Sequence, residues 1–182
     1  TDIYDLEKYQ HNNALDHGLI AYYPLDGNSL DNAIDQLDGT DTSMTYPPDD
    51  DMGDVADFNG TDGDIAISRG IPVSSNISFS FWIKPSSATV QRIVDGSTAN
   101  QSAFVITGGG AYVSIPQNNI AVIDKLSSNA LYAAYTPDGE WHNFAFRIDG
   151  NSGTIYKDGV AQSTTDNLTS RTLTSIGSIG RI

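Results

Sequence analysis

The sequence contains no cysteine and almost no glutamate. Without cysteine, the chain of 182 residues has neither a disulfide framework nor a thiolate for catalysis or zinc binding. Glu7 and Glu140 are its only glutamates, although Asp and Glu together number 23. Glutamate favours helices, whereas aspartate favours turns, caps and metal-binding loops. These two shortages predict a chain rich in strands and loops.

Basic residues are also scarce. Lys and Arg number only 9, so the formal net charge is -14 and the sequence pI is about 4.1. Such a surface repels phosphate backbones and anionic membranes, and nucleic acid and lipid are therefore excluded as expected partners. The sequence shows no signal peptide and no transmembrane run. Because it starts at Thr1 rather than Met, we expect a processed product or a fragment.

The apolar pattern divides the chain at Gly18. Residues 2–17 carry Ile3, Leu6 and Tyr9 at helical spacing, which predicts a short N-terminal helix. After Gly18 the period becomes two, and many short strands alternate with Gly and Asx turns. We therefore expect an N-terminal helix or linker at residues 1–18, followed at 19–182 by one all-β domain, a sandwich of two antiparallel sheets.

Two alternating segments are predicted to form the middle of the core. Residues 77–84 place Ile77, Phe79, Phe81 and Ile83 on one face, with Ser78, Ser80, Trp82 and Lys84 on the other. Residues 141–148 likewise place Phe144, Phe146 and Ile148 on a shared face, with His142 nearer its end. For His142, packing or hydrogen bonding is favoured over a role as a general base.

Five segments together resemble a known family of bacterial laminin-G-like, concanavalin A-like domains. They occur in family order: LIAYYPLDG at 19–27, DFNGTDGDIAI at 57–67, ISFSFWIKP at 77–85, WHNFAFRIDG at 141–150 and TIYKDG at 154–159. The resemblance implies a jelly-roll sandwich, commonly a non-catalytic module for glycan binding or adhesion, often with a structural calcium. Fold alone does not establish function.

The family usually closes with one more strand, and this chain ends at Ile182 where that strand should begin. We expect either that the chain is cut there or that another chain supplies the strand. An unpaired strand edge invites strand addition, including addition by copies of the same chain.

Calcium is the expected cofactor, because short oxygen side chains cluster in two loops. The candidate ligands are Asp26, Asn28 and Asp31 in one loop and Asp57, Asp62 and Asp64 in the other. By resemblance, the first loop is the one that often holds the structural ion. The alternative for both loops is that these residues form Asx turns, and it stays open at this point.

A glycan site needs an aromatic platform with a few polar groups. The expected ligand-binding residues are Tyr46, Tyr112, Tyr132 and Tyr135, of which the last two are expected in a loop or at an edge. Trp82 faces away from the predicted core, but packing against a loop or the other sheet is favoured for it.

Hydrolysis is disfavoured, because glycosidases on this fold use a Glu-x-Asp-x-Glu strand that two glutamates cannot form. We expect a non-catalytic, lectin-like adhesion module of an extracellular or cell-surface protein that binds a glycan or a surface protein. The alternative is a structural subunit or head domain of a surface filament, such as a pilin-like fibre.

Overall fold

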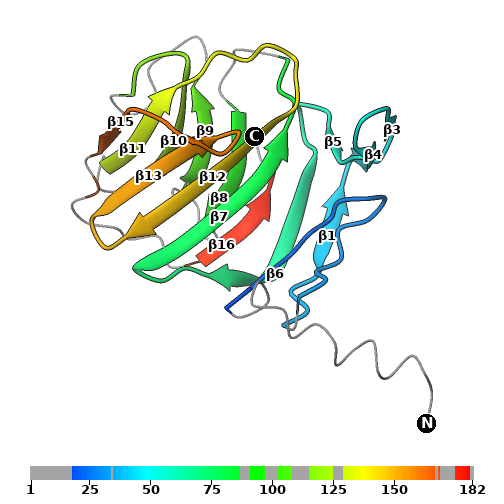
Figure 1. The fold of residues 1–182 in the computed structure, drawn as a ribbon. Coiled ribbons are helices and arrows are strands. Elements are labelled where there is room, and N and C mark those ends of the chain that lie inside the picture. The colour runs from blue at the N-terminus through cyan, green and yellow to red at the C-terminus, as the bar shows by residue number, and fades with distance from the viewer. Residues whose placement is uncertain are drawn as a thin grey trace.

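The structure is a computed structural model, and it describes residues 18–33, 35–86, 91–96, 102–107, 115–124, 129–166, 168 and 175–180. The helix predicted for residues 2–17 lies outside these residues. The described chain is all-β, which confirms the predicted fold class. Figure 1 shows two large facing sheets, and two further sheets have two strands each. Among the helices of the described residues, none has the length and apolarity needed to cross a membrane.

The two large sheets are antiparallel throughout. The eight-stranded sheet has the order β1 (Gly39–Thr42), β6 (Asp64–Pro72), β16 (Ser175–Ile179), β8 (Gln91–Gly96), β9 (Ser102–Thr107), β10 (Asn119–Asp124), β11 (Asn129–Ala134), β15 (Thr164–Asp166). The four-stranded sheet has the order β14 (Val160–Ala161), β13 (Ser152–Lys157), β12 (His142–Asp149), β7 (Asn76–Ile83). The two small sheets pair β2 (Met44–Thr45) with β5 (Asp57–Phe58) and β3 (Pro48–Asp49) with β4 (Gly53–Asp54), and only the second pair is a hairpin of consecutive strands.

The main core lies between the sheets. A single cluster of buried side chains extends from Ile67 and Ile176 in the eight-stranded sheet to Phe144, Phe146 and Ile155 in the four-stranded sheet. Each of these five side chains is almost completely buried. Their burial removes apolar surface from water, and it is the main force that holds the two sheets together.

A second, smaller cluster lies on the other face of the eight-stranded sheet. Along β10, Ile120 and Val122 belong to the main core, whereas Ala121 and Ile123 belong to the second cluster. Tyr132 of β11 packs against this second cluster. This strict alternation follows from the pleat of the strand, which turns successive side chains to opposite faces.

The position of β7 differs from the prediction that β7 and β12 both form the middle of the core, whereas that of β12 agrees with it. The inward-facing side chains of β12 are buried, but those of β7 are only half-buried. Phe79 is paired across the sheet with Phe146, and yet only Phe146 is fully enclosed. The reason is that β7 is the edge strand of the four-stranded sheet, whereas β12 has a neighbour on each side.

Residues 19–25, within the first of the five family segments, form no strand, and Leu25 lies in the left-handed region with a φ of 59°. The backbone N–H of Tyr22 donates to the Asp31 carboxylate at 2.7 Å, and its carbonyl accepts from Asn32 N–H at 2.8 Å. These bonds tie Tyr22 to the following loop instead of to a sheet. Ile20, Ala21 and Tyr23 still pack against the main core.

We expect Phe146→Ala to lower the free energy of unfolding by about 3–5 kcal/mol, because it empties a fully enclosed site. Phe79→Ala should cost clearly less, since water already reaches the half-buried Phe79 ring. Urea unfolding of both variants measures the difference. Equal losses would contradict the description of β7 as a partly uncovered edge.

Candidate functional site

The first predicted calcium loop is held together by hydrogen bonds that backbone N–H groups donate to side-chain oxygens. Asp31 is buried, and its carboxylate accepts from the N–H groups of Tyr22, Ala33 and Leu37 at 2.7–2.9 Å. Asn28 Oδ1 accepts from Leu30 N–H at 2.9 Å. Both oxygen side chains therefore stabilise the loop as Asx-type turns.

The second predicted calcium loop has the same construction around Asn59. Its Oδ1 accepts from the backbone N–H groups of Thr61, Asp62 and Gly63, and its amide donates to the Asp62 carboxylate at 2.8 Å. Asp57 lies on β5 and Asp64 begins β6. Within the described residues, no three or more His, Cys, Asp or Glu side chains form a group suited to a metal ion.

The four predicted ligand-binding tyrosines do not form one surface. Tyr112 lies outside the described residues. Tyr46 donates to Asp41 of β1, while Tyr132 lies on β11. The two strands are six strand spacings apart in the eight-stranded sheet, or about 29 Å at about 4.8 Å each.

Tyr46 and Tyr135 are also partly or fully enclosed. Burial and the hydrogen bond to the Asp41 carboxylate raise the pKa of Tyr46 to about 12. Tyr135 is 5% exposed and packs edge-on against Phe144, with ring centroids 4.9 Å apart. It therefore belongs to the core rather than to an exposed loop.

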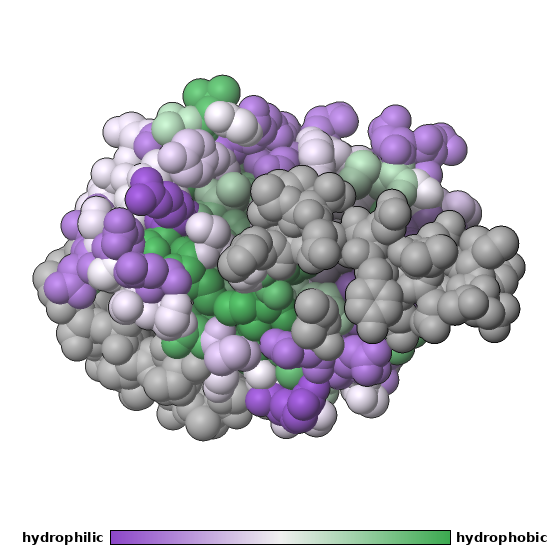
Figure 2. All heavy atoms as spheres, turned by 60° about the horizontal axis from the view of Figure 1, so that its bottom comes forward, coloured by the Kyte–Doolittle hydropathy of each residue, from purple (hydrophilic) through white to green (hydrophobic). Residues whose placement is uncertain are grey.

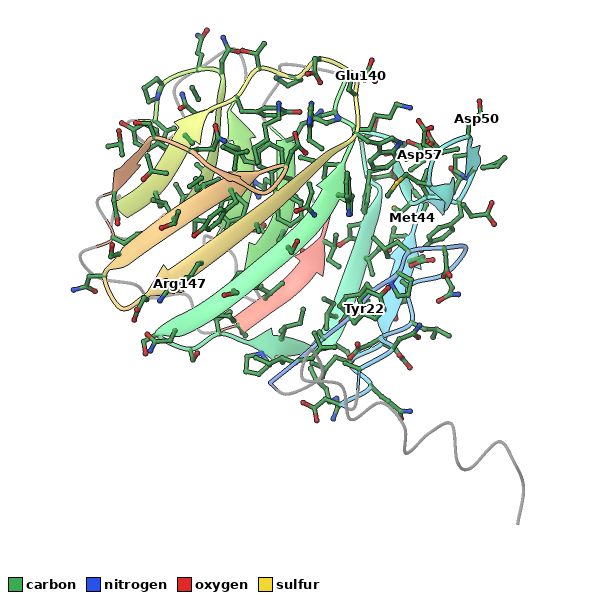
Figure 3. All side chains as sticks on the ribbon, in the orientation of Figure 1. Tyr22, Met44, Asp50, Asp57, Glu140 and Arg147 are labelled. Atoms are coloured by element: carbon green, nitrogen blue, oxygen red, sulfur yellow. The ribbon has the colours of Figure 1, made fainter. Side chains whose placement is uncertain are left out.

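Trp82 is the most solvent-exposed aromatic side chain of the four-stranded sheet, and it lies on the face that points away from the core. We call this face of β7, β12 and β13 the outer face. Trp82 is 53% exposed, so the packing favoured for it from the sequence is wrong. Trp82 lies between Phe81 and Ile83 in the strand, and both of these side chains pack on the core side. Because successive side chains of a strand alternate, the Trp82 side chain points away from the core. Figure 3 shows the outer face toward the viewer, with Arg147 labelled on β12.

Small and polar side chains surround Trp82 on the outer face. Its partner on β12 is Asn143, whose amide donates to Ser80 Oγ at 3.2 Å and to the Phe81 carbonyl at 3.4 Å. The Asn143 backbone N–H donates to Asp158 at 3.0 Å. A flat apolar ring beside oriented amide and hydroxyl groups is an arrangement that suits a sugar.

A second tryptophan lies beside this end of the sheet, where polar contacts hold it. Trp141 Nε1 donates to Asp49 Oδ1 at 3.0 Å, and Lys84 Nζ lies 3.1 Å from Asp49 Oδ2. The Lys84 ammonium is also 5.8 Å from the centroid of the Trp141 ring. The Asp51 N–H and the Lys84 ammonium hold the pKa of Asp49 below its usual value.

His142 begins β12 on the core side and is bonded through both ring nitrogens. Nδ1 lies 2.7 Å from Asp158 Oδ2 and Nε2 lies 3.1 Å from Asp138 Oδ2, in agreement with the expected hydrogen-bonded role. Burial alone would lower the pKa of His142, but the bonds to the two carboxylates outweigh this effect and raise it. The histidine thus ties the loop before β12 and the turn after β13 to the start of β12.

Comparison with known proteins identifies the family. Residues 59–181, more than half of the chain, match the family model described as the concanavalin A-like lectin/glucanases superfamily. The chain belongs to this superfamily. No curated protein matches it.

A solved structure has a similar fold. It is domain 4 of AbnA, a GH43 extracellular arabinanase from Geobacillus stearothermophilus, in complex with arabinotriose. The TM-score is 0.64 at 21% sequence identity, and the alignment covers 88% of this chain and 82% of that chain. At this identity the likeness shows a shared fold.

The ligand-binding residues expected from the sequence include neither Asn143 nor Tyr156, which the strand registers place on the outer face with Trp82. A sequence signal for Trp82 was present in the concanavalin A-like chain. Trp82 shares its phase of alternation with Ser78 and Ser80, so a large aromatic residue interrupts an otherwise small and polar stripe. Tyr156 could be placed on the same face only once the pairing of β12 with β13 was known.

The stability of the domain should depend on pH through His142. Because the pKa of His142 is raised in the folded state, the protonated imidazole stabilises the fold below the ordinary histidine pKa, and this stabilisation is lost as the pH rises through the raised value. Because the pKa values of Asp138 and Asp158 are lowered, their carboxylates stabilise the fold above the ordinary aspartate pKa, and this stabilisation is lost as the pH falls through the lowered values. The unfolding free energy of the wild type minus that of His142→Gln should therefore be largest between about pH 4 and about pH 6.5.

Urea unfolding across a pH series measures this difference. Asp138→Asn and Asp158→Asn should each weaken the same pH dependence, because each removes one of the two carboxylates that face the imidazole. A difference between wild type and His142→Gln that is constant with pH would show that the imidazole acts only as a neutral hydrogen-bonding group.

Proposed function

We propose that this concanavalin A-like domain is a non-catalytic carbohydrate-binding module of an extracellular or cell-surface protein, and that it binds its glycan on the outer face at Trp82. The observation that carries this proposal is the 53% exposure of Trp82 amid small and polar neighbours. Adhesion to a glycan-covered surface is the role we assign to the whole protein.

The physical reason is the match between an indole ring and a sugar. An exposed indole leaves a large apolar surface in water, at a cost that a ligand can remove by covering it. Sugars present C–H groups on one face and hydroxyl groups around the edge, so a sugar can stack on Trp82 while Asn143 and Ser80 supply polar contacts. Sites of this kind combine an apolar platform with a few well-placed polar groups.

Three carboxylates at this end of the four-stranded sheet support a binding role over hydrolysis. Glycoside hydrolysis needs two carboxyl groups facing each other across the sugar. Near Trp82, Asp158 and Asp138 are bonded to His142, and Asp49 is bonded to Lys84 and Trp141. These three carboxylates serve structural contacts.

Trp82→Ala should weaken glycan binding by about tenfold or more, which corresponds to at least about 1.4 kcal/mol, because it removes the stacking surface. A glycan array selects the ligand, and isothermal titration measures the loss. Arabino-oligosaccharides belong in the array because the structurally similar AbnA domain was solved with arabinotriose.

Val160→Ala is the matched control for this variant. Val160 is 63% exposed on β14, so its truncation also removes exposed apolar surface but leaves Trp82 in place. Unchanged affinity in Trp82→Ala, with a defined glycan bound by the wild type, would place the site elsewhere. Tyr46 and Tyr132 would then be the next positions to test.

Calcium stays a separate proposal. The six oxygen side chains expected to bind it lie in the loops around Asp31 and Asn59 or on the strands β5 and β6 beside them, so a bound ion would stabilise these segments rather than contact a sugar on Trp82. Running the array with calcium and again with EDTA therefore tests the ion independently of the glycan.

A second candidate function is that of a structural subunit whose copies associate through β7. This edge strand, NISFSFWI, carries no charged residue, although exposed natural edges usually carry charges that block pairing. In Figure 1 the front sheet ends at β7, and β16 of the rear sheet is visible beyond that edge. Viewed from below, apolar side chains are visible in the middle of the molecule (Figure 2).

Antiparallel pairing of β7 with its copy would give a two-fold dimer with a continuous sheet. The net charge of -14 opposes this contact, so association should increase with ionic strength. Size-exclusion chromatography with light scattering at low and high salt measures the mass. Ser78→Lys should abolish the dimer, and Ser152→Lys on β13 adds the same charge away from the edge. A monomer at high protein concentration and high salt would contradict this candidate.

A further inference from the structure

A second aromatic side chain, Tyr156, lies on the outer face with Trp82. The register of β7 with β12 aligns Ser80 with Ala145, and the register of β12 with β13 aligns Ala145 with Tyr156. Residues paired in this way point to the same side of a sheet. Tyr156 is therefore on the outer face, one step of the alternation away from the row that holds Trp82 and Asn143.

The separation of the two rings follows from the register. Trp82 and Tyr156 are offset by two strand spacings of about 4.8 Å and by two residues of about 3.4 Å each, so their Cα atoms are about 12 Å apart. This distance is longer than one sugar ring. A single monosaccharide cannot stack on both side chains, whereas an extended oligosaccharide can.

The row of residues that leads across the sheet to Tyr156 has short side chains, which rise little above the backbone. Ser80 and Ala145 occupy the row of Tyr156 on the strands toward Trp82, and Ala161 flanks Tyr156 on its other side. None of these three residues has a side chain that rises as far from the sheet as an aromatic ring. A chain of sugars can therefore pass from one ring to the other along the sheet.

The charges of this face favour an uncharged ligand. Two ion pairs lie on or beside it, Arg147 with Asp149 at 3.4 Å and Lys84 with Asp49 at 3.1 Å, and in each pair the two charges largely neutralise each other. The chain as a whole carries a net charge of -14, which repels polyanionic glycans at long range.

We propose that Trp82 and Tyr156 are two stacking subsites for one extended, neutral oligosaccharide that crosses β7, β12 and β13. This inference rests on the proposed glycan-binding function and adds the length and charge class of the ligand. Trp82, the more exposed ring, forms the primary subsite, and Tyr156 adds affinity only for ligands long enough to reach it.

The experiment measures affinity against ligand length. The array includes arabino-, xylo-, cello- and manno-oligosaccharides and identifies the class that binds. Oligosaccharides of that class, in increasing length, are then titrated into the wild type and the variants. Affinity for the wild type should rise with length until both rings are covered. Tyr156→Ala should remove that rise, a loss of about tenfold for the longest ligand, and leave the affinity for the shortest one unchanged. Tyr156→Phe should restore it, because the ring remains.

A blocking variant tests the path between the rings. Ala145→Leu places a larger side chain between the two subsites and should reduce the affinity for long ligands only. Ser78→Leu is its matched control, since Ser78 lies on the same face but on the side of Ser80 away from Trp82.

The outcomes separate this inference from the proposed function. If Trp82→Ala weakens binding but Tyr156→Ala leaves the affinity unchanged for ligands of every length, glycan binding at Trp82 stands and the second subsite is wrong. If the wild type binds none of the oligosaccharides, both fail. Equal or tighter binding of uronate oligosaccharides of the same length would overturn the neutral class.

Discussion

The hydrogen-bond register between β7 and β12 is the constraint on which both faces of the four-stranded sheet depend. The same ladder that pairs Phe79 with Phe146 in the core pairs Trp82 with Asn143 on the outside. A slip of one residue would bring Trp82 into the core and expose the phenylalanines. The burial of Phe144, Phe146 and Ile148 therefore also determines which residues meet solvent on the outer face.

Much of the fold could be predicted, because local alternation reports which side chains share a face. The core side of residues 77–84 and the fold class were both correct. Whether a strand lies in the middle or at the edge of a sheet depends on partners far away in the sequence, and no local pattern reports it. For this reason β7 was expected in the middle of the core, and Trp82 was expected to be packed.

The candidate site was harder to predict because it is made of residues from separate strands. Tyr156 reaches the face of Trp82 only through two consecutive registers, one of which joins residues more than sixty positions apart. The tyrosines chosen from the sequence were plausible one by one, but the eight-stranded sheet separates β1 from β11. Asn28 and Asp31 are candidate calcium ligands by residue type, and only the structure shows that their side-chain oxygens accept from backbone N–H groups.

The outer face consists of paired strands rather than loops, and this has a consequence for how its recognition can change. Residues on a hydrogen-bonded sheet are held in place before any partner arrives, so little conformational entropy is lost on contact and induced fit contributes little. Loop insertions would leave such a surface unaltered. Its selectivity would instead evolve by single substitutions at every second position of β7, β12 and β13, each of which leaves the buried side of the same strand untouched.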